Sequence, residues 1–428
     1  MTAGAAGTPG SPELSRALGL RDATVIGVAS MVGAGVFAAF APAARAAGDG
    51  LLIGLAIAAV IAFANATSSA QLAAQYPRSG GTYVYGREQL GPWWGFLAGW
   101  GFVIGKTASC AAMALTFAAY VAPEGWERLV AALAVAALAG VNLFGVTRTA
   151  GLAAIIVTVV LLVLAVVVAS GVAGALPGGG LLDPSGLVAE GWYGIMQSGG
   201  LLFFAFAGYA RMATMGEEVR EPSRTIPRAI VLALGVAVVV YAAVGVVALA
   251  ALGAEALGAS AAPLVDVVRA NDWAWAAPLV RIGGAAASLG ALLALIAGVG
   301  RTSLAMARER DLPAPLARVG ARFRVPWVSE ASVALVVIVL VLTVDLRGAI
   351  GFSSFGVLLY YLVANVAAYT QGRDDRRYPR WLQVLGAIGC LVLVATLPWT
   401  SVVAGVAVFA VGVVGRLVVL ALRRRSRG

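Results

Sequence analysis

Long apolar runs alternate with short polar connections along almost the whole chain. A run of about 18 apolar residues or more is long enough to cross a bilayer as a helix. The pattern predicts about twelve such helices, at approximately 23–47, 51–74, 92–122, 128–145, 150–173, 192–216, 228–252, 274–300, 329–345, 348–370, 380–397 and 399–421. No aqueous domain interrupts the series, so we expect an all-α integral membrane protein.

Charged residues are divided unequally between alternate connections. If the N-terminus lies inside the cell, most arginines fall on the inner side, from Arg16 and Arg21 to the tail at 423–427. Acidic residues such as Asp183 and Glu190 then fall on the outer side. Because inner loops of membrane proteins are enriched in arginine and lysine, this arrangement predicts that both termini are cytoplasmic.

Composition excludes several classes of protein. Only 12% of the residues are charged, whereas a soluble domain has about 25%. The net charge of +10 follows from the arginine-rich loops, and no basic stripe with interleaved aromatic residues indicates nucleic-acid binding. Histidine is absent, which excludes Ser-His-Asp triads and the common zinc sites. We expect no enzyme activity, metal or cofactor, and no disulfide between Cys110 and Cys390, which both fall within predicted spans.

Two of the predicted spans are interrupted near their middle. The stretch "SMVGAGVFAAF" places Gly33 and Gly35 inside the first span, and each glycine weakens a helix by about 1 kcal/mol relative to alanine. The sixth span is interrupted at "FAGY", residues 206–209. The two spans lie five apart and therefore run in opposite directions. Paired interruptions of this kind point to a transporter site within an inverted repeat.

A broken helix frees backbone groups that hydrocarbon cannot satisfy, so a ligand or other protein groups must bind them. New helix starts near Gly35 and Ala210 would direct their positive dipole ends at the bilayer midplane, which suits a carboxylate. The preceding helix ends present carbonyl groups, which suit an ammonium. An amino acid supplies both charges. Taken singly, each glycine could instead serve close helix packing.

Four stretches resemble the amino acid–polyamine–organocation (APC) transporter superfamily, in order, over about 18–370. They are "VIGVASMVGAGVF", "YPRSGGTYVYGREQLGPWWGFLAGW", "FFAFAGYARMATMGEEVREPSRTIPRAI" and "RTSLAMARERDLP". The resemblance implies the LeuT-like fold, with two inverted repeats of five helices and two further helices. The implied divisions are a cytoplasmic tail at 1–20, repeats at 21–173 and 191–370, helices 11 and 12 at 380–422, and a basic tail at 423–428.

The resemblance also implies a substrate site. The amides of Ala34 and Gly35 would hold the carboxylate, with Gly33 allowing the approach. The carbonyls of Met31, Phe204 and Ala207 would hold the ammonium, and the Phe204 ring would form a gate over the substrate. Packing in the core is the alternative for that ring. The complete candidate set is Met31, Gly33, Ala34, Gly35, Val36, Phe204, Ala205, Ala207 and Gly208.

Two departures from the family pattern concern ion coupling. Ala210 stands where many members carry an acidic residue, and the fifth span lacks the lysine of many proton-coupled members. Lys106 is the only lysine in the chain and lies deep in the third span, where a cation costs at least about 2.5–3.5 kcal/mol. The family often has a tyrosine here, close to the position of Ala210. Our hypothesis is that Lys106 supplies a fixed or switchable charge in the inner vestibule, standing in for a coupling cation or proton site. The alternative is a structural cation held by helix-end carbonyls or a carboxylate.

Other candidates favour structural roles. We interpret Glu217 and Glu218 as salt-bridge partners of nearby arginines rather than as acid–base catalysts. We expect Trp93, Trp94 and Tyr120 to lie at the membrane interface.

The sequence thus predicts a secondary amino-acid transporter acting by uniport, symport or exchange. No P-loop appears, so the energy for transport must come from gradients. The site lacks a deep carboxylate that could pair with a cationic side chain, which favours neutral substrates. A cationic amino acid or polyamine antiporter and a non-transporting sensor of the same fold are the alternatives. The expected partners are an amino acid, a possible proton or other coupling ion, and the lipid bilayer. Richness in alanine, glycine and arginine, with a single lysine, suggests a GC-rich bacterial genome, which favours the plasma membrane as the location.

Overall fold

The computed structural model describes residues 18–77, 80–144, 150–175, 186–213, 215–216, 218–320, 322–323 and 325–425. The expectations for most of the N-terminal tail, for Asp183 and Glu217 and for the end of the basic tail lie outside the described residues. Within them, the regular structure is helical apart from one isolated bridge between Leu18 and Val219.

The helices follow the predicted spans. In chain order they are α1 (Leu20–Met31), α2 (Ala34–Ala38), α3 (Phe40–Ala47), α4 (Leu51–Gln75), α5 (Thr82–Leu90), α6 (Pro92–Val121), α7 (Glu127–Leu143), α8 (Ala150–Ala175), α9 (Gly191–Phe206), α10 (Ala210–Ala213), α11 (Pro222–Ala259), α12 (Pro263–Ala270), α13 (Ala277–Arg308), α14 (Trp327–Thr343), α15 (Leu346–Tyr369), α16 (Arg380–Thr396) and α17 (Trp399–Arg425). Short 3₁₀ turns occupy Gly48–Gly50, Ala207–Tyr209, Ala274–Ala276 and Ala314–Ala317. Eight helical stretches are long and apolar enough to cross a membrane, and α14 and α16 are shorter apolar helices. The expected all-α, multi-pass membrane protein is confirmed.

Two predicted spans are broken into pieces. The first comprises α1, α2 and α3, and the sixth comprises α9, a 3₁₀ turn and α10. The short helices α5 and α12, which lie in the connections, were not among the predicted elements. The seventh span starts earlier than predicted, at Pro222, because a proline fits the first turn of a helix, where no intrahelical partner for its nitrogen is needed.

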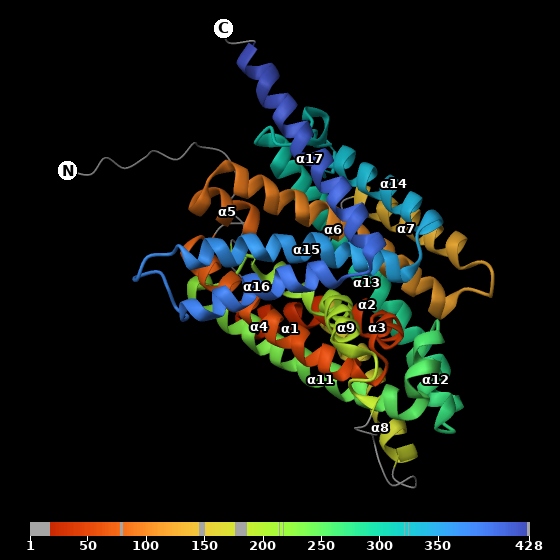
Figure 1. Ribbon diagram of the computed structural model, residues 1–428. Coiled ribbons are helices and arrows are strands. Elements are labelled where there is room, and N and C mark those ends of the chain that lie inside the picture. Colours follow the sequence, from red (N-terminus) through yellow and green to blue (C-terminus); the bar gives the residue numbers. More distant parts are fainter. Residues whose placement is uncertain are drawn as a thin grey trace.

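The broken segments lie inside the bundle. In Figure 1, α1, α2 and α9 lie among α4, α11 and α6, and each of these neighbours contacts at least one of the broken pieces. The helices α6 and α15 approach closely through glycines, since a Cβ on Gly356 would lie 2.6 Å from the carbonyl oxygen of Gly101. Close approach through small residues is a common means of helix association in membranes.

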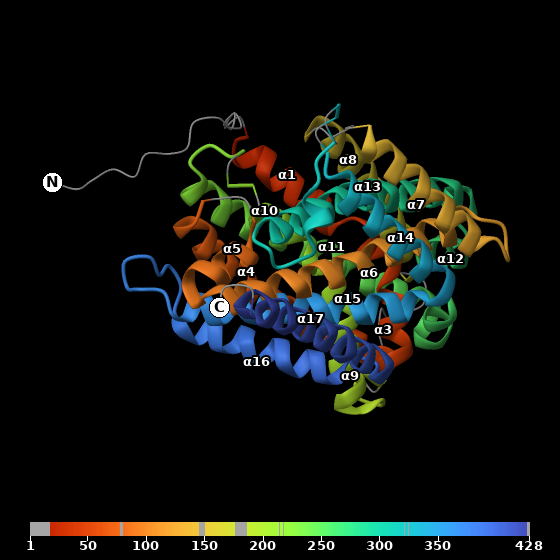
Figure 2. The ribbon, with the colours of Figure 1, turned by 90° about the horizontal axis from the view of Figure 1, so that it is seen from above.

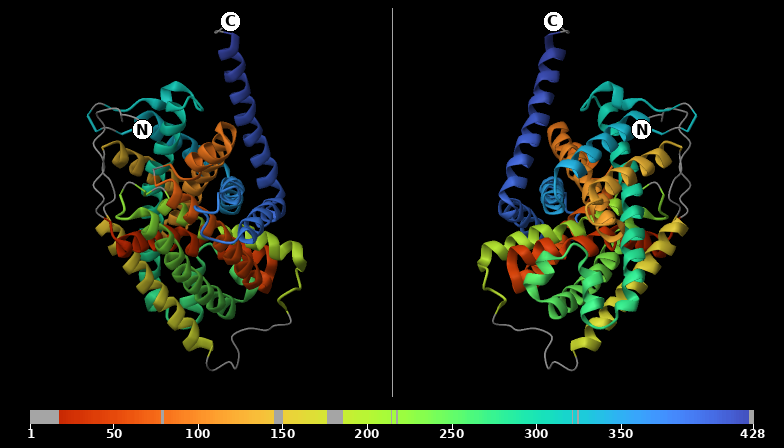
Figure 3. Two further views of the ribbon diagram at one scale, coloured as in Figure 1. Left: turned by 90° about the vertical axis from the view of Figure 1, so that its left-hand side faces the viewer. Right: turned by 90° about the vertical axis from the view of Figure 1, so that its right-hand side faces the viewer.

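The last two helices lie at the margin. Figure 2 shows α16 and α17 along one edge, and in Figure 3 α17 extends past the other helices. Only 6% of the 18-residue apolar stretch of α17 is buried. Contacts with α15, α6 and α16 hold this helix to the bundle.

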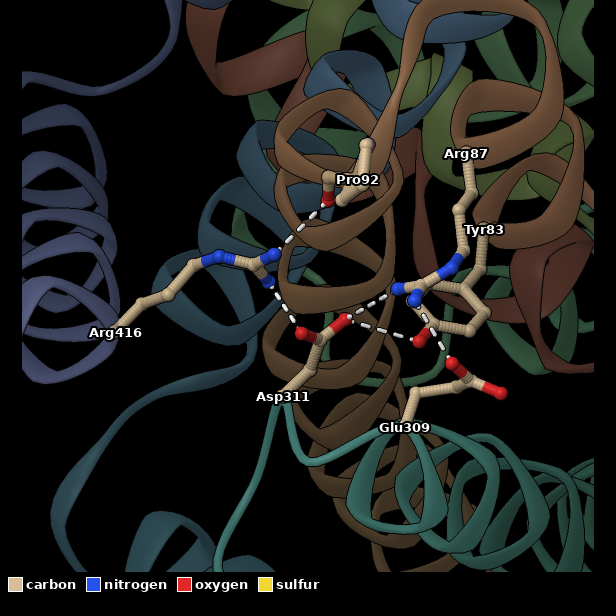
Figure 4. A network of polar contacts seen from close by, with 6 residues as sticks. All are labelled: Tyr83, Arg87, Pro92, Glu309, Asp311 and Arg416. Atoms are coloured by element: carbon tan, nitrogen blue, oxygen red, sulfur yellow. Dashed lines mark hydrogen bonds and ion pairs between the residues drawn. The ribbon is translucent and has the colours of Figure 1, made fainter. Parts of the chain in front are cut away.

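A polar network holds α17 to the other helices through Arg416 (Figure 4). The Arg416 guanidinium lies 2.5 Å from one carboxylate oxygen of Asp311. The other oxygen accepts a hydrogen bond of 2.9 Å from the Tyr83 hydroxyl and lies 3.5 Å from Arg87. Burial raises the pKa of the Asp311 carboxyl, and the charge of Arg416 acts in the opposite direction. The network joins α5, the residues after α13, and α17.

The prediction for Tyr120 was wrong. Its side chain is wholly buried rather than interfacial, and its hydroxyl donates to the carbonyl of Phe37 over 3.2 Å. A phenol inside the bundle needs such an acceptor, which sequence position alone does not reveal.

Trp93 and Trp94 are partly exposed, and Cys110 and Cys390 are free thiols.

Candidate functional site

The first break creates a helix start inside the protein. The chain bends at Val32 and Gly33, and α2 begins at Ala34. The bend removes the acceptors that the preceding turn would offer to the N–H groups of Ala34, Gly35 and Val36, and no side chain caps the new start. All three residues are buried. A buried helix start of this kind favours an anion.

The helix that starts here is longer than α2 alone. The residue between α2 and α3, Ala39, keeps right-handed helical dihedral angles, and its N–H donates to the carbonyl of Gly35. The bend there has a local cause, because Pro42 cannot donate to the carbonyl of Ala38. Residues 34–47 therefore form one bent helix whose dipole starts at the first break.

The second break is tighter. At the end of α9 the N–H of Ala207 donates to the carbonyls of Phe203 and Phe204, which leads into the 3₁₀ turn before α10. Ala205, Ala207 and Ala210 are buried, whereas Gly208 is partly exposed.

The structure brings the two breaks into contact. A Cβ on Gly35 would lie 2.6 Å from the Cα of Ala205, and a Cβ on Gly208 would collide with the carbonyl of Ser30. Both glycines are therefore required by close approach. The Tyr241 hydroxyl of α11 lies 2.6 Å from the carbonyl oxygen of Met31 and 3.0 Å from that of Ala205, so it links the first break to the second.

Lys106 reaches the second break from α6. Its ammonium donates to the carbonyl of Ala207 over 3.1 Å, and the side chain is buried. Ala207 caps the C-terminal end of α9, where the helix dipole favours a cation. Among the described residues, two acidic side chains are buried, those of Glu330 and Asp311. The first packs against Gly300 and the second pairs with Arg416, so neither is placed at the breaks. Lys106 is therefore held by a helix-end carbonyl.

Phe204 is also buried, in one apolar cluster with Ala34, Ala38 and Ala291. The last three residues come from α2 and α13, and α9, which carries Phe204, is in contact with α2. This placement fits both a gate and a core side chain, and the gate remains a prediction.

Sequence reasoning missed two tyrosines that complete the site. Besides Tyr241, the Tyr361 hydroxyl of α15 lies 3.4 Å from the carbonyl of Ala207. A tyrosine within an apolar span needs a hydrogen-bond partner, and this was the available signal. The partners could not be named, because they are carbonyls on distant segments.

A family model described as "Amino acid permease" matches residues 18–419, which include both breaks and Lys106. The chain belongs to the amino acid permease family. It is therefore a transporter rather than an enzyme, and the predicted membership of the APC superfamily is confirmed. The amino acid permease match also means that the substrate is an amino acid.

Curated relatives of the permease cover most of its length. An uncharacterized transporter of Mycobacterium tuberculosis is 57% identical over 97% of this chain and 94% of its own. The branched-chain amino acid permease of Bacillus subtilis is 23% identical over 93% of this chain and 91% of its own. The human cationic amino acid transporter 4 is 28% identical over 81% of this chain and 58% of its own. The names of the last two relatives refer to branched-chain and to cationic amino acids, respectively.

Proposed function

We propose that this permease is a secondary active transporter that carries neutral amino acids by alternating access, with its substrate held where the two broken helices meet. The observation that carries the proposal is the buried, uncapped helix start at Ala34–Val36, in contact with the second break at Ala205. We further propose that 21–173 and 191–370 are inverted repeats, and that both termini face the cytoplasm of a bacterial plasma membrane.

The two ends of the substrate would bind different backbone groups. The carboxylate would accept from the N–H groups of Ala34 and Gly35. The ammonium would donate to the carbonyls of Met31, Phe204 and Ala207. The Met31 oxygen already accepts from Tyr241 and the Phe204 oxygen from the amide of Ala207, so by the count of two lone pairs one remains on each for the substrate. The Ala207 oxygen has two donors, Lys106 and Tyr361, and there the ammonium would take the place of the longer bond from Tyr361.

The charges around the breaks support a neutral side chain. Lys106 places a positive charge at the second break, and no described acidic residue is buried there. A lysine or arginine substrate would bring a net positive charge into this low-dielectric region, where repulsion between like charges is strong. A substrate with a neutral side chain has no net charge, because its carboxylate balances its ammonium.

Lys106 itself has two possible roles. We propose that its charge stands in for a coupling cation or proton site, since it touches the hinge of the second broken helix. The competing structural role is to cap α9. Substitution with methionine separates the two, because a coupling role requires the pH dependence of transport to change.

The test is uptake of radiolabelled amino acids into proteoliposomes, with an inward proton gradient imposed or absent and with protein-free liposomes as the control. We expect alanine, serine or leucine to enter and arginine and putrescine to be excluded. Accumulation only with the gradient would identify proton symport, and a requirement for internal amino acid would identify exchange. Preferred uptake of arginine or putrescine would refute the neutral substrate, and binding without flux would favour a sensor.

A further inference from the structure

A groove of about 550 Å³ opens at the start of α11, away from the two breaks. Its walls come from the start of α1, the first turns of α11 and the connection between α15 and α16. Figure 1 shows α1 beside α11, and the two helices are in contact. The charge pattern of the sequence assigns this end of the bundle to the cytoplasm.

Three arginines line the groove, namely Arg224, Arg228 and Arg377. Among the described residues that line it, none is acidic. Arg224 forms an ion pair with Glu221 over 3.8 Å, and both side chains of that pair are largely exposed. An exposed pair of this kind neutralises little charge. The groove therefore carries an excess of positive charge.

The third arginine is held in place. The Arg377 guanidinium donates to the carbonyl of Ser223 over 2.6 Å. The backbone N–H groups of Arg377 and Tyr378 both donate to the buried side chain of Gln71, over 3.3 and 3.2 Å. This cation therefore stands at a fixed position beside the first turn of α11.

The face of α11 that carries the arginines continues as an apolar surface. Residues at every fourth position lie on one face of a helix, and Arg224 and Arg228 are followed at this spacing by Leu232 and Val236. Both apolar side chains are exposed, as is Val239 one turn further. The cations thus stand at the end of an apolar strip that runs along the helix.

We propose that this groove binds an anionic phospholipid of the inner leaflet. The headgroup phosphate would lie among the three guanidinium groups, which donate hydrogen bonds to phosphate oxygens in a fixed geometry. One acyl chain would lie along Leu232, Val236 and Val239. Basic pockets between membrane helices on the cytoplasmic side are suited to such headgroups. The apolar strip favours a lipid over a soluble phosphate, which could use only the arginines.

Native mass spectrometry of the delipidated full-length protein tests this proposal. The probes are palmitoyl-oleoyl phosphatidylglycerol, the matching phosphatidylcholine, and glycerol 3-phosphate as a headgroup without acyl chains. The test variant is R224Q/R228Q, and the matched control is R308Q/R318Q, which removes two exposed arginines outside the groove. All four side chains are exposed, so both variants should keep the melting midpoint of the wild type.

We expect the wild type to retain phosphatidylglycerol in preference to phosphatidylcholine. R224Q/R228Q should lower phosphatidylglycerol occupancy about tenfold, since two cations near the phosphate are lost, whereas the control should match the wild type. Millimolar glycerol 3-phosphate should not displace the lipid. Equal retention by the two variants, equal binding of the two lipids, or displacement by glycerol 3-phosphate would each overturn the proposal.

Discussion

Replacing Arg416 with glutamine removes the most buried ion pair among the described residues. The side chains of Arg416 and Asp311 are only 8% and 6% exposed. The substitution also removes a hydrogen bond to the carbonyl of Pro92 and the stacking of the guanidinium over Trp93 and Phe96, whose ring centres lie 4.8 and 4.5 Å from its central carbon. A buried carboxylate is left with fewer partners.

The size of the effect follows from this geometry. Removing one partner of a buried ion pair costs about 3–5 kcal/mol. Asp311 keeps the hydrogen bond from Tyr83 and the nearby charge of Arg87, and it can take up a proton, so we expect the lower end, about 3 kcal/mol at neutral pH. The matched control is E309Q in the same network. It breaks a pair with Arg87 in which Glu309 is 51% exposed, so it should cost about 1 kcal/mol or less.

The loss of stability in R416Q should depend on pH. Burial already raises the pKa of Asp311, and without Arg416 the pKa should rise further. A carboxyl whose pKa is raised by folding contributes its full stability below the pKa of the unfolded chain, about 3.9, and loses it as the pH rises through the folded-state pKa. The deficit of R416Q should therefore be larger at pH 7.5 than at pH 5. The lost aromatic stacking does not depend on pH, so part of the deficit should persist.

Thermal unfolding in detergent, followed by intrinsic tryptophan fluorescence, measures these differences. We expect R416Q to melt several degrees below the wild type at pH 7.5, E309Q to melt close to the wild type, and the R416Q deficit to shrink at pH 5. Equal midpoints for the two variants at pH 7.5, or a deficit that is the same at both pH values, would refute the reasoning.

Three further predictions concern the broken helices. G35A should reduce uptake at least about tenfold, because the new Cβ would lie 2.6 Å from the neighbouring helix, whereas G140A, whose Cβ meets nothing within 4 Å, should retain it. K106M should change the pH profile of uptake, and an unchanged profile would assign Lys106 a structural role only. Y241F should destabilise the protein by about 1 kcal/mol in melting measurements, since its hydroxyl links two backbone carbonyls, and an unchanged midpoint would contradict that link.

Two features of this structure could be predicted from the sequence. The length of the apolar runs predicted the spans, and residues that weaken a helix predicted the two breaks. Each predicted span coincides with a helix, and both interruptions occur where glycines and small residues weaken the sequence. The resemblance of short stretches also named the family correctly, because these motifs combine backbone constraints with fixed spacing.

The contacts between distant segments could not be predicted. Arg416 lies in a predicted apolar span and gives no indication of Asp311, more than a hundred residues earlier. Tyr120 resembles an interfacial tyrosine until its acceptor on Phe37 is known. The partner of Lys106 depends on how α6 packs against the end of α9. Periodicity reports which face of a helix is apolar, but it does not report which helix that face meets.

The central claim is that the amino-acid carboxylate binds the helix start at Ala34–Val36, and competition for uptake tests it most directly. With the neutral amino acid that the protein carries, proteoliposomes would be challenged with three unlabelled competitors: the same amino acid, its carboxamide and its decarboxylated amine. We predict that the amino acid competes and that both analogues without a carboxylate lose about a hundredfold or more in apparent affinity, because buried N–H groups would be left unpaired. Equal competition by the carboxamide or the amine would contradict the account.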